Sequence, residues 1–350
     1  MPKKYTKPKT LPFTGWNPTE HGVTQSLLQK FTGCKDRFHK HVMLGLRETG
    51  RKEAMEYGSI FHKLLEIGTL LGKNNSRLNI LKQANIAFKN KEIESNDLIL
   101  TAVSQYFEYV KWEQDKPKYK YIAAEPVFRE NYELPVISFN PCEEINIRIP
   151  KGVVIPLRGR IDEVLEINGK MWIQENKTKG QINESFLIDT IPSNIQVMFY
   201  AVCSQLKYGR NCHGVIYNVI RKPALRQRQT ESTEDFLQRI KEDIEQQPDH
   251  YFKRYSYEFQ KGQIDKWIKE ELNPLLVHVY LWYKSICKNP TDPWVGPNPF
   301  HGRRSFGIYD SMTLGKGDFY ELIVNGRTQD LIVSNELFPE LVEDEGTVNE

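Results

Sequence analysis

The sequence predicts an α/β protein in which a core of alternating strands and helices carries helical additions on both sides. Two observations indicate this class. Residues 121–220 alternate between strand-like and helix-like apolar patterns, whereas residues 24–121 carry apolar side chains at helical spacing. In the middle of the alternating part, Asn168-Gly169 separates two apolar, β-branched runs, and this dipeptide is the strongest short-range signal for a β-hairpin.

Composition and periodicity divide the chain into four regions. They are a basic, proline-bearing arm at residues 1–20, a helical region at 21–120, the α/β core at 121–225, and a helical and strand extension with an acidic tail at 226–350. Within the core we expect a strand at 121–128, the hairpin, a helix that opens at Pro192-Ser193 and ends before Gly209, and a strand at 214–220.

The extension begins with a clear helix signal. Ser232 and Asp235 form a capping box for a helix that reaches about residue 247. A strand at 251–259 and an amphipathic helix at about 262–288 follow. Residues 290–350 carry proline, glycine and turn signals, from which we draw no function.

The composition is that of a soluble globular protein, with 39% hydrophobic and 27% charged residues among 350. No run approaches the roughly 18 consecutive apolar residues of a membrane span, and the basic N-terminus lacks the apolar core of a signal peptide. Five cysteines without a CxxC pair predict free thiols in a reducing compartment. We therefore expect a cytoplasmic protein with no membrane partner, and the net charge of +3 is too small to name another partner.

The Asn168-Gly169 turn fixes the register of the two strands beside it. If these are the two loop residues, the positions that flank the turn pair with each other, and Asp162 comes to lie opposite Glu175. In the same register Arg160 would face Lys177. Because side chains alternate between the two faces of a strand, we expect both acids and Lys177 on the same face.

Two carboxylates on opposed residues repel each other. Their β-carbons would be roughly 5 Å apart, where like charges are destabilising, so the pair either shares a proton or holds a cation. A surface hairpin in which Lys177 forms an ordinary salt bridge is the alternative. Apolar neighbours on both faces of the hairpin favour a chemical role for the acids.

Two helical segments add polar residues at i, i+4 spacing, which places each pair on one face of its helix. The first pair is Gly58 and His62, and the second is Gln196 and Tyr200. A packed core histidine and a buried hydrogen-bonded pair are the alternative interpretations. A site built on carboxylates prefers a hard ion, Mg²⁺ or Mn²⁺, over zinc.

Four motifs occur in order along the chain: Gly58-x-x-x-His62, Gly159-x-x-Asp162, Glu175-x-Lys177 and Gln196-x-x-x-Tyr200. Together they resemble the RecB-type branch of the PD-(D/E)XK nuclease superfamily. The run at 24–38 is similar to the opening signature of that branch, and the strand that ends at 217–223 is similar to phage members. The resemblance covers residues 24–225 and implies a restriction-endonuclease-like core, a central mixed sheet flanked by helices.

The resemblance also implies a set of metal ligands. Asp162 and Glu175 would ligate Mg²⁺ or Mn²⁺ together with the backbone carbonyl of Asn176, and His62 would complete the shell or bind a second ion. Glu125, on the strand before the hairpin, is either an additional acid of this site or a charge at a sheet edge.

Three further residues would serve the chemistry or the substrate. Lys177 would orient the attacking water and stabilise the developing charge, and Gln196 and Tyr200 would position the DNA backbone or the lysine. These roles suit phosphodiester hydrolysis, because a metal activates water near neutral pH and neutralises charge on the phosphate, while an ammonium adds electrostatic stabilisation.

Basic residues at two places suggest contacts to DNA phosphates. One cluster follows the last strand of the core and comprises Arg221, Lys222, Arg226 and Arg228. Arg158 and Arg160 precede the first acid and could contact phosphates nearer the chemistry. The alternative for either group is a solvated charged face.

Many relatives hold an iron–sulfur cluster with one cysteine before the core and three after it. Here Cys34 occupies the first position, but Cys287 is the only cysteine in the later region, and a cluster needs four thiolates. We therefore expect no iron–sulfur cluster.

The sequence thus predicts a metal-dependent deoxyribonuclease, an exonuclease that resects DNA ends for recombination or repair and has phage or bacterial character. Its partners would be DNA and possible recombination proteins, such as a recombinase or a single-strand-binding protein. Two alternatives stay open at this point: a structure-specific or defence endonuclease on the same core, and a catalytically idle DNA-binding subunit of a recombination complex.

Overall fold

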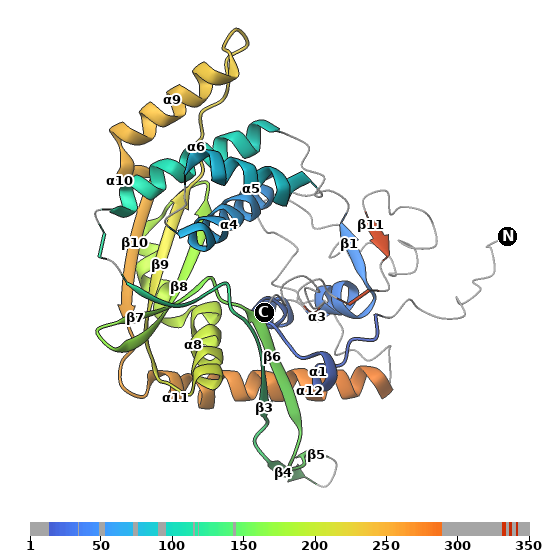
Figure 1. Cartoon of the computed structure of the whole chain (residues 1–350). Helices are drawn as coiled ribbons and strands as arrows, with labels where there is room; N and C mark the ends of the chain where they lie inside the picture. Colours follow the sequence, from blue (N-terminus) through green and yellow to red (C-terminus); the bar gives the residue numbers. More distant parts are fainter. Residues whose placement is uncertain are drawn as a thin grey trace, which may run out of the picture. The chain divides into compact units, whose positions relative to one another are not determined.

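The computed structural model describes residues 14–33, 35–48, 53–72, 76–89, 96–114, 116–117, 119–142, 145–288, 331–333, 336–337 and 341. The chain divides into two compact units, whose helices and strands are labelled in Figure 1. Unit 2 comprises Arg51–Val127 and Arg160–Ile264, and unit 1 comprises Met1–Gly50, Phe128–Gly159 and Asp265–Glu350. All of the predicted catalytic and metal-binding residues belong to unit 2, whereas most of the expected basic arm and Cys34 lie outside the described residues.

Unit 2 is built on a five-stranded sheet with the order β10-β9-β8-β7-β2. Its strands are β2 (Lys120–Ala124), β7 (Glu163–Ile167), β8 (Lys170–Lys179), β9 (Cys212–Arg221) and β10 (Phe252–Glu258). The central pair, β8 and β9, is parallel, and the other neighbours are antiparallel. This is the mixed sheet flanked by helices that the sequence resemblance implies.

The hairpin between β7 and β8 confirms the predicted turn. Asn168 and Gly169 both have positive φ, 52° and 76°, and the register runs from Ile167 opposite Lys170 to Glu163 opposite Gln174. Positive φ at both loop positions is what a two-residue hairpin turn requires, and asparagine and glycine tolerate it best.

The predicted register is wrong beyond Glu163. Asp162 lies in a bend just before β7, so the ladder does not extend to a cross-strand pair with Glu175. Arg160 does not face Lys177, because it ends another strand, β6 (Val154–Arg160), which pairs with β3 (Val127–Glu133). The expected single strand at 121–128 is also two strands, β2 and β3, which are interrupted at Glu125.

Helices flank the sheet of unit 2. They are α4 (Glu53–Leu71), α5 (Arg77–Lys89), α6 (Asn96–Gln114), α7 (Glu184–Thr190), the 3₁₀ turn η3 (Ile191–Ser193), α8 (Ile195–Tyr208), α9 (Thr233–Gln246) and α10 (Pro248–Tyr251). The Asn194 side chain caps α8, and Gly209 ends it in the left-handed conformation. The helix therefore starts slightly later than predicted, because Pro192-Ser193 belongs to the preceding 3₁₀ turn.

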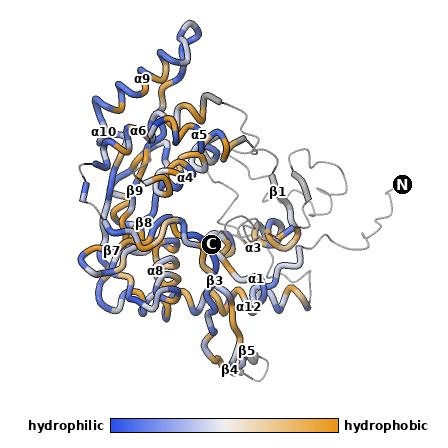
Figure 2. Tube along the Cα trace, in the orientation of Figure 1, coloured by the Kyte–Doolittle hydropathy of each residue, from blue (hydrophilic) through white to orange (hydrophobic). Residues whose placement is uncertain are grey.

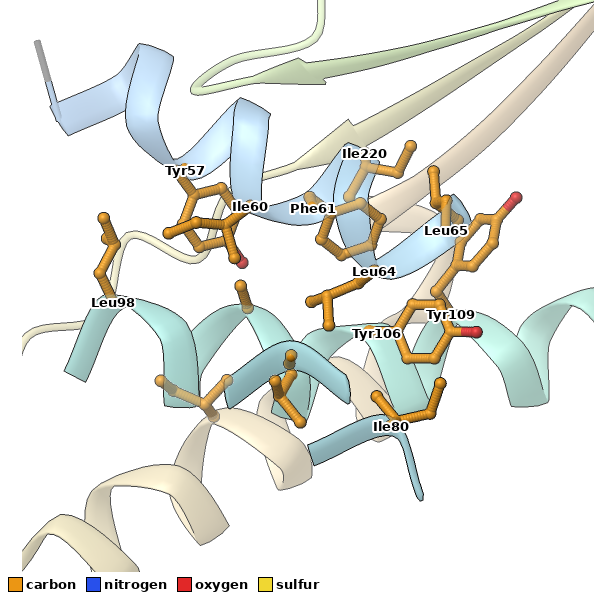
Figure 3. Close-up of a cluster of buried hydrophobic side chains, with 14 of the residues drawn as sticks. Tyr57, Ile60, Phe61, Leu64, Leu65, Ile80, Leu98, Tyr106, Tyr109 and Ile220 are labelled. Carbon is orange, nitrogen blue, oxygen red and sulfur yellow. The ribbon is translucent and has the colours of Figure 1, made fainter. Parts of the chain in front are cut away.

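The core of unit 2 lies where α4, α5, α6 and α9 pack together with the ends of β9 and β10 (Figure 3). Tyr57, Phe61 and Leu64 of α4 are fully buried there. Burying one such side chain stabilises the fold by about 1.5–3 kcal/mol relative to leaving it exposed. The predicted cap of α9 is confirmed, since the Ser232 side chain accepts a hydrogen bond from the backbone N–H of Asp235.

Helix α9 shows how the sequence pattern directs a helix to this core. Its buried residues, Phe236, Ile240 and Ile244, recur every four positions and form one stripe. The remaining positions are mostly charged, so the tube alternates between hydrophobic and hydrophilic colours along the helix (Figure 2).

Unit 1 contains α1 (Pro18–His21), α2 (Gln25–Gly33), α3 (Lys35–Phe38), the π-helical turns η1 (His39–Met43) and η4 (Ile268–Leu272), and α12 (Asn273–Lys288); α11 (Gln263–Trp267) starts in unit 2 and continues into unit 1. Its strands form the pairs β1 (Leu46–Glu48) with β11 (Leu331–Val333), β3 with β6, and β4 (Ile137–Cys142) with β5 (Ile145–Ile149). Edge-to-face contacts among Phe31, Phe38 and Trp282 form the centre of this unit. The predicted helix at 262–288 is confirmed.

No single helix in the described parts of the chain is long and apolar enough to cross a membrane. One pair of consecutive helices, Glu184–Ser193 and Ile195–Tyr208, is together long and apolar enough to span a membrane, but it is bent by 41°. The second helix of this pair is α8, in which the residues from Val197 to Ser204 are buried inside the protein.

Candidate metal centre

Strand β8 carries two of the predicted residues on the same face. Glu175 and Lys177 are two positions apart, so their side chains leave the strand in the same direction. The Lys177 Nζ donates a hydrogen bond of 3.0 Å to the Glu175 Oε2. Glu175 is completely buried, whereas the lysine side chain keeps 24% of its surface exposed. The ammonium is thus held next to the carboxylate and still has access to solvent.

Helix α8 covers this face of β8. The Gln196 Nε2, in its first turn, donates a hydrogen bond of 2.9 Å to the same Glu175 Oε2. Tyr200 is buried one turn further along the helix. The second oxygen of the carboxylate, Glu175 Oε1, is buried without a hydrogen-bond partner in the described structure. A buried acceptor without a partner is costly, so this oxygen has an unused capacity to bind a ligand.

Asp162 is fixed by the bend that precedes β7. Its Oδ2 accepts a hydrogen bond of 2.6 Å from the backbone N–H of Asn176, and its Oδ1 lies 3.5 Å from the His62 Nδ1 on α4. Asn176 thus connects the two strands of the hairpin where the ladder itself has ended. The bend places Asp162 next to β8 and within reach of α4.

Glu125 joins this group from the end of β2. Its backbone N–H donates a hydrogen bond of 2.7 Å to the Asp162 carbonyl, and its φ is +49°. Non-glycine residues with positive φ are uncommon and cluster at functional sites. One ligand atom each of His62, Glu125 and Asp162 lies within 4.8 Å of the other two. The structure therefore supports the first of the two interpretations of Glu125, an additional acid of the site.

The compact three-residue cluster differs from the predicted ligand set in one respect. It contains Glu125 in place of Glu175 and Asn176. Glu175 is nevertheless close enough for its charge and that of Asp162 to influence each other, and its free oxygen Oε1 remains available. The sequence signal for Glu125 is modest: an acid that directly follows a strand and precedes a proline.

The close approach of α4 to β8 sets the position of His62. A β-carbon built on Gly58 would lie 2.8 Å from the Thr178 Oγ1, which is closer than real β-carbons come to other atoms. Gly58 lies four residues before His62 on the same helix. The absence of a side chain at this position therefore allows α4 to pack closely enough to bring His62 to Asp162.

The electrostatics of the site show a surplus of negative charge. Burial, to which the Asp162 carboxylate adds, raises the pKa of Glu125 to about 7. Burial and, to a smaller extent, Asp162 also raise the pKa of Glu175 to about 7, although Lys177 opposes them. Burial also raises the pKa of Asp162, but His62 and Lys177 outweigh it and hold this pKa below its usual value. The acids are thus in an environment that favours either bound protons or a bound cation.

For the two bases, burial and the neighbouring carboxylates act on the pKa in opposite directions. Burial lowers the pKa of His62, but the neighbouring Asp162 carboxylate outweighs this effect and raises it overall. Burial likewise lowers the pKa of Lys177, and Glu175 and Asp162 raise it well above its usual value. Lys177 therefore stays an ammonium throughout the physiological pH range.

These residues fit a divalent cation. The donor set consists of carboxylate oxygens and one imidazole nitrogen, which suits hard or borderline ions. Among the residues that the structure describes, none provides a hydrogen-bond partner for the buried Glu175 Oε1, and a cation would supply one. Burial raises the pKa of Glu125 and of Glu175 to about 7, and a bound cation would favour the charged form of both carboxylates.

A buried polar network lies behind the centre, on the opposite face of β8, and the sequence reasoning missed it. The Asn218 Nδ2 donates hydrogen bonds to the Asn176 Oδ1 (2.9 Å) and to the Tyr109 hydroxyl (3.2 Å). The Arg254 Nε donates to the Asn218 Oδ1 at 2.6 Å, and its Nη2 contacts the Glu113 Oε2 at 2.5 Å. An asparagine inside the apolar strand 214–220 was the available signal.

The same face also carries a buried acid. The Gln174 Nε2 donates a hydrogen bond to the Glu163 Oε2, and both side chains are buried. Burial, followed by the charges of Asp162 and Glu113, raises the pKa of Glu163 to about 8.

The predicted DNA-binding residues occupy different environments. Arg158 is buried in unit 1, where its Nη1 donates to the carbonyls of His21 and Leu341, so its guanidinium is used inside the protein. This placement argues against the predicted phosphate contact of Arg158. Arg160 lies 3.8 Å from Glu125, the Arg221 Nη1 lies 3.3 Å from His250, and Lys222 lies over the Tyr57 ring. Arg226 and Arg228 are exposed.

Comparison with known proteins gives one decisive match. The model of the PD-(D/E)XK nuclease superfamily matches residues 23–267, which include every residue of the metal centre. No curated protein matches the chain. Similar solved structures include the crystal structure of SSO0001, which is 14% identical with a TM-score of 0.27 and covers 72% of this chain and 76% of that chain. The crystal structure of protein VC1899 from Vibrio cholerae is 14% identical with a TM-score of 0.17 and covers 77% of this chain and 58% of that chain.

At these TM-scores, neither structural likeness carries information about function. The family match, in contrast, spans most of the chain, and the structure shows a mixed sheet that carries acids and a lysine. The chain belongs to the PD-(D/E)XK nuclease superfamily.

Proposed function

We propose that this protein is a Mg²⁺- or Mn²⁺-dependent deoxyribonuclease of the RecB-type branch, which acts as an exonuclease on DNA ends. The observation that carries the proposal is the convergence of His62, Glu125 and Asp162 beside the Glu175 carboxylate, whose free oxygen is buried. The membership in a nuclease superfamily supplies the reaction class, phosphodiester hydrolysis.

The first proposed role is to hold the cation. His62, Glu125, Asp162 and Glu175 would hold the cation. Glu175 would offer Oε1, because Lys177 and Gln196 both bond to Oε2. A bound divalent cation supplies Lewis acidity and lowers the pKa of water to a value near neutrality.

Lys177 acts on the substrate side. It stays positively charged, and its exposed part can approach a phosphate, so it stabilises the negative charge that develops there and orients the attacking water. Gln196 is a positioning residue, because its amide fixes the orientation of the Glu175 carboxylate. Tyr200, one turn further along α8, is assigned to the same supporting role.

The phosphate contacts would come from the basic cluster after β9, which comprises Arg221, Lys222, Arg226 and Arg228. Such contacts bind the DNA backbone irrespective of sequence. Arg158 is left out of the set, because its guanidinium is bonded to backbone carbonyls. The order of the four sequence motifs supports the RecB-type branch, and it suggests resection for recombination or repair together with a recombinase or a single-strand-binding protein.

Cleavage of linear and circular duplex DNA tests the proposal. The full chain is incubated with each substrate in Mg²⁺ and, separately, in Mn²⁺. Degradation of linear DNA alone is expected of an exonuclease, and nicked circles would instead indicate an endonuclease. No cleavage with either ion would overturn the nuclease proposal and support an idle DNA-binding subunit.

Two variants attribute the activity to the metal centre. Asp162→Ala should abolish cleavage and should remove the uptake of Mg²⁺ measured by calorimetry. Asp189→Ala is the matched control, because Asp189 is an exposed acid on α7 outside the centre. If Asp162→Ala cleaves as the wild type does, the assignment of the centre is wrong.

A further inference from the structure

A cavity of about 640 Å³ opens at one end of the unit 2 sheet, where the parallel strands β8 and β9 both end. We call it the strand-end cavity. Its lining includes Leu98, Gly180, Lys222, Leu225, Arg226 and Phe236. Crevices outside the carboxyl ends of parallel strands are where open α/β sheets bind ligands. The size falls within the range of small-molecule and nucleotide sites, about 300–1,000 Å³.

The lining combines an apolar floor with a basic rim. Leu98 and Phe236 are buried, and Pro223 and Leu225 extend the apolar surface. Arg226 is exposed at the rim and, among the residues that the structure describes, has no acidic side chain as an ion-pair partner. An apolar surface beside an uncompensated cation is complementary to a flat heterocycle that carries a phosphate.

The loop that forms the rim is held in place. The backbone N–H of Lys222 donates a hydrogen bond of 2.8 Å to the Lys179 carbonyl, and the carbonyl of Arg226 accepts one of 2.9 Å from the Arg239 Nη2. Arg239 is in turn bound by Glu231 at 2.7 Å. Because these bonds fix the loop, the rim is largely preorganised for a ligand.

The cavity lies along the same strand as the catalytic groups. Gly180 directly follows β8 and is three residues beyond Lys177, which corresponds to about 10 Å at roughly 3.3 Å per residue. Nucleotides in one strand of B-form DNA are spaced by about 3.4 Å along the axis. A DNA strand that passes Lys177 can therefore reach the cavity within a few nucleotides.

We propose that the strand-end cavity binds an unpaired nucleotide of the DNA strand that is cleaved. Its base packs on the apolar floor, and its phosphate contacts Lys222 and Arg226. A base inside a duplex can enter only by leaving its stack, which costs a few kcal/mol. The site therefore favours single-stranded or frayed DNA over intact duplex. This inference rests on the proposed function, because it names the form of DNA that the nuclease engages.

Binding of a single-stranded oligonucleotide to the full chain tests this inference. The oligonucleotide contains 2-aminopurine, whose fluorescence reports on stacking, and EDTA prevents turnover. Ala224→Trp fills the cavity from an exposed position, so its folding should be unaffected, and we expect an affinity for the single strand about tenfold lower. Gln229→Trp adds the same side chain at an exposed position of the same loop outside the lining and should bind like the wild type.

A charge variant tests the phosphate contact. Arg226→Ala should weaken binding and reduce the slope of log affinity against log salt by about 0.7, as expected for one lost contact to a single strand. Lys261→Ala, an exposed cation of unit 2 outside the cavity, should leave both quantities unchanged. An unchanged slope in Arg226→Ala would overturn the phosphate contact.

The outcomes separate this inference from the proposed function. If the wild type cleaves DNA and Ala224→Trp binds the single strand as tightly as Gln229→Trp does, the nuclease proposal stands and the cavity assignment fails. If the wild type cleaves no DNA but binds the single strand, and Ala224→Trp binds it more weakly than Gln229→Trp does, the cavity assignment stands and the nuclease proposal fails.

Discussion

The polar side chains on the two faces of strand β8 differ in how far their hydrogen-bonding capacity is used. On the face covered by α8, one oxygen of Glu175 has no hydrogen-bond partner in the described part of the chain, and Lys177 keeps part of its surface in solvent. On the other face, Asn176 is bonded to Asn218, and Gln174 is bonded to Glu163. One face thus retains the capacity to bind a ligand, while the other is a network of polar groups that bond to each other.

The difference shows how one strand can separate chemistry from its support. Neighbouring residues point to opposite faces, so the chain can place a reactive acid and a structural amide in adjacent positions. The two faces remain connected through the backbone, because the N–H of Asn176 holds Asp162 while its side chain belongs to the network. Substitutions on the face covered by α8 should therefore lower activity, whereas substitutions on the network face should lower stability.

The largest effect is expected on the reactive face. Lys177→Ala should lower the rate of cleavage by about 10²–10³, because under the proposed function it removes a preorganised charge that would lie next to the scissile phosphate. Single-turnover cleavage at pH 8 measures the rate, while calorimetry and DNA titration should show that metal and DNA still bind. Lys170→Ala, on the same strand but at the exposed turn, is the control. A wild-type rate in Lys177→Ala would remove its assigned role.

On the network face, Asn218→Leu should destabilise the fold by about 2–4 kcal/mol. The substitution leaves Arg254 and Asn176 with unpaired polar atoms in a buried site. Urea denaturation measures the free energy of unfolding, and cleavage at low temperature should fall much less than in Lys177→Ala. Asn218→Asp keeps the acceptor for Arg254 and should lose less stability. Equal losses in both variants would show that the bond to Arg254 contributes little.

The affinity for Mg²⁺ should depend on pH through the reactive face. Glu175 and Glu125 have pKa values of about 7, so below that pH they hold protons that compete with the cation. We expect the affinity to rise between pH 6 and pH 8, by about tenfold per pH unit for each proton displaced below its pKa. Calorimetric titrations across this range measure the slope. Glu175→Gln should flatten it, and an equally steep slope in that variant would assign the proton elsewhere.

The last expected effect concerns Glu163 and changes stability rather than activity. Its pKa of about 8 in the folded state exceeds the usual value of 4.5, so the folded protein holds a proton that the unfolded chain releases. The resulting contribution to stability is present below about pH 4.5 and is lost as the pH rises through about 8. Glu163→Gln should therefore be more stable than the wild type at pH 8, by up to about 4 kcal/mol for the full difference between the two pKa values.

Thermal unfolding at pH 5 and pH 8 measures this difference. The advantage of Glu163→Gln should disappear at pH 5, where the wild-type carboxyl is protonated as well. Asp189→Asn, which changes an exposed acid, should follow the wild type at both values. A constant difference between Glu163→Gln and the wild type would mean that the effect is one of packing and not of titration.

The contrast between the two faces also explains what the sequence could predict. The hairpin depends on two adjacent residues, Asn168 and Gly169, and the helix ends depend on local caps such as Ser232, so both could be predicted from short segments. The alternation along β8 then placed Glu175 and Lys177 on one face. These features depend on interactions between residues that are close together in the sequence or linked by a short turn.

The features that were missed depend on residues far apart in the chain. The network joins Glu113 on α6, Asn176 on β8, Asn218 on β9 and Arg254 on β10, and no local pattern couples these positions. The bend at Asp162 was missed because a strand pattern continues through it in the sequence. Arg158 carries the charge expected of a DNA contact, but carbonyl groups from distant segments of unit 1 bind it.

The contact between Gly58 and Thr178 has a consequence for metal selectivity. A methyl group on Gly58 would act as a spacer, since Thr178 must rotate or α4 must move to admit it. A displacement of α4 away from β8 would carry His62 away from Asp162 and enlarge the metal centre. In Gly58→Ala the affinity for a larger ion such as Ca²⁺ should therefore rise relative to the affinity for Mg²⁺. The discrimination between ions of different radius would then depend on a single hydrogen atom at the point where a helix touches a strand.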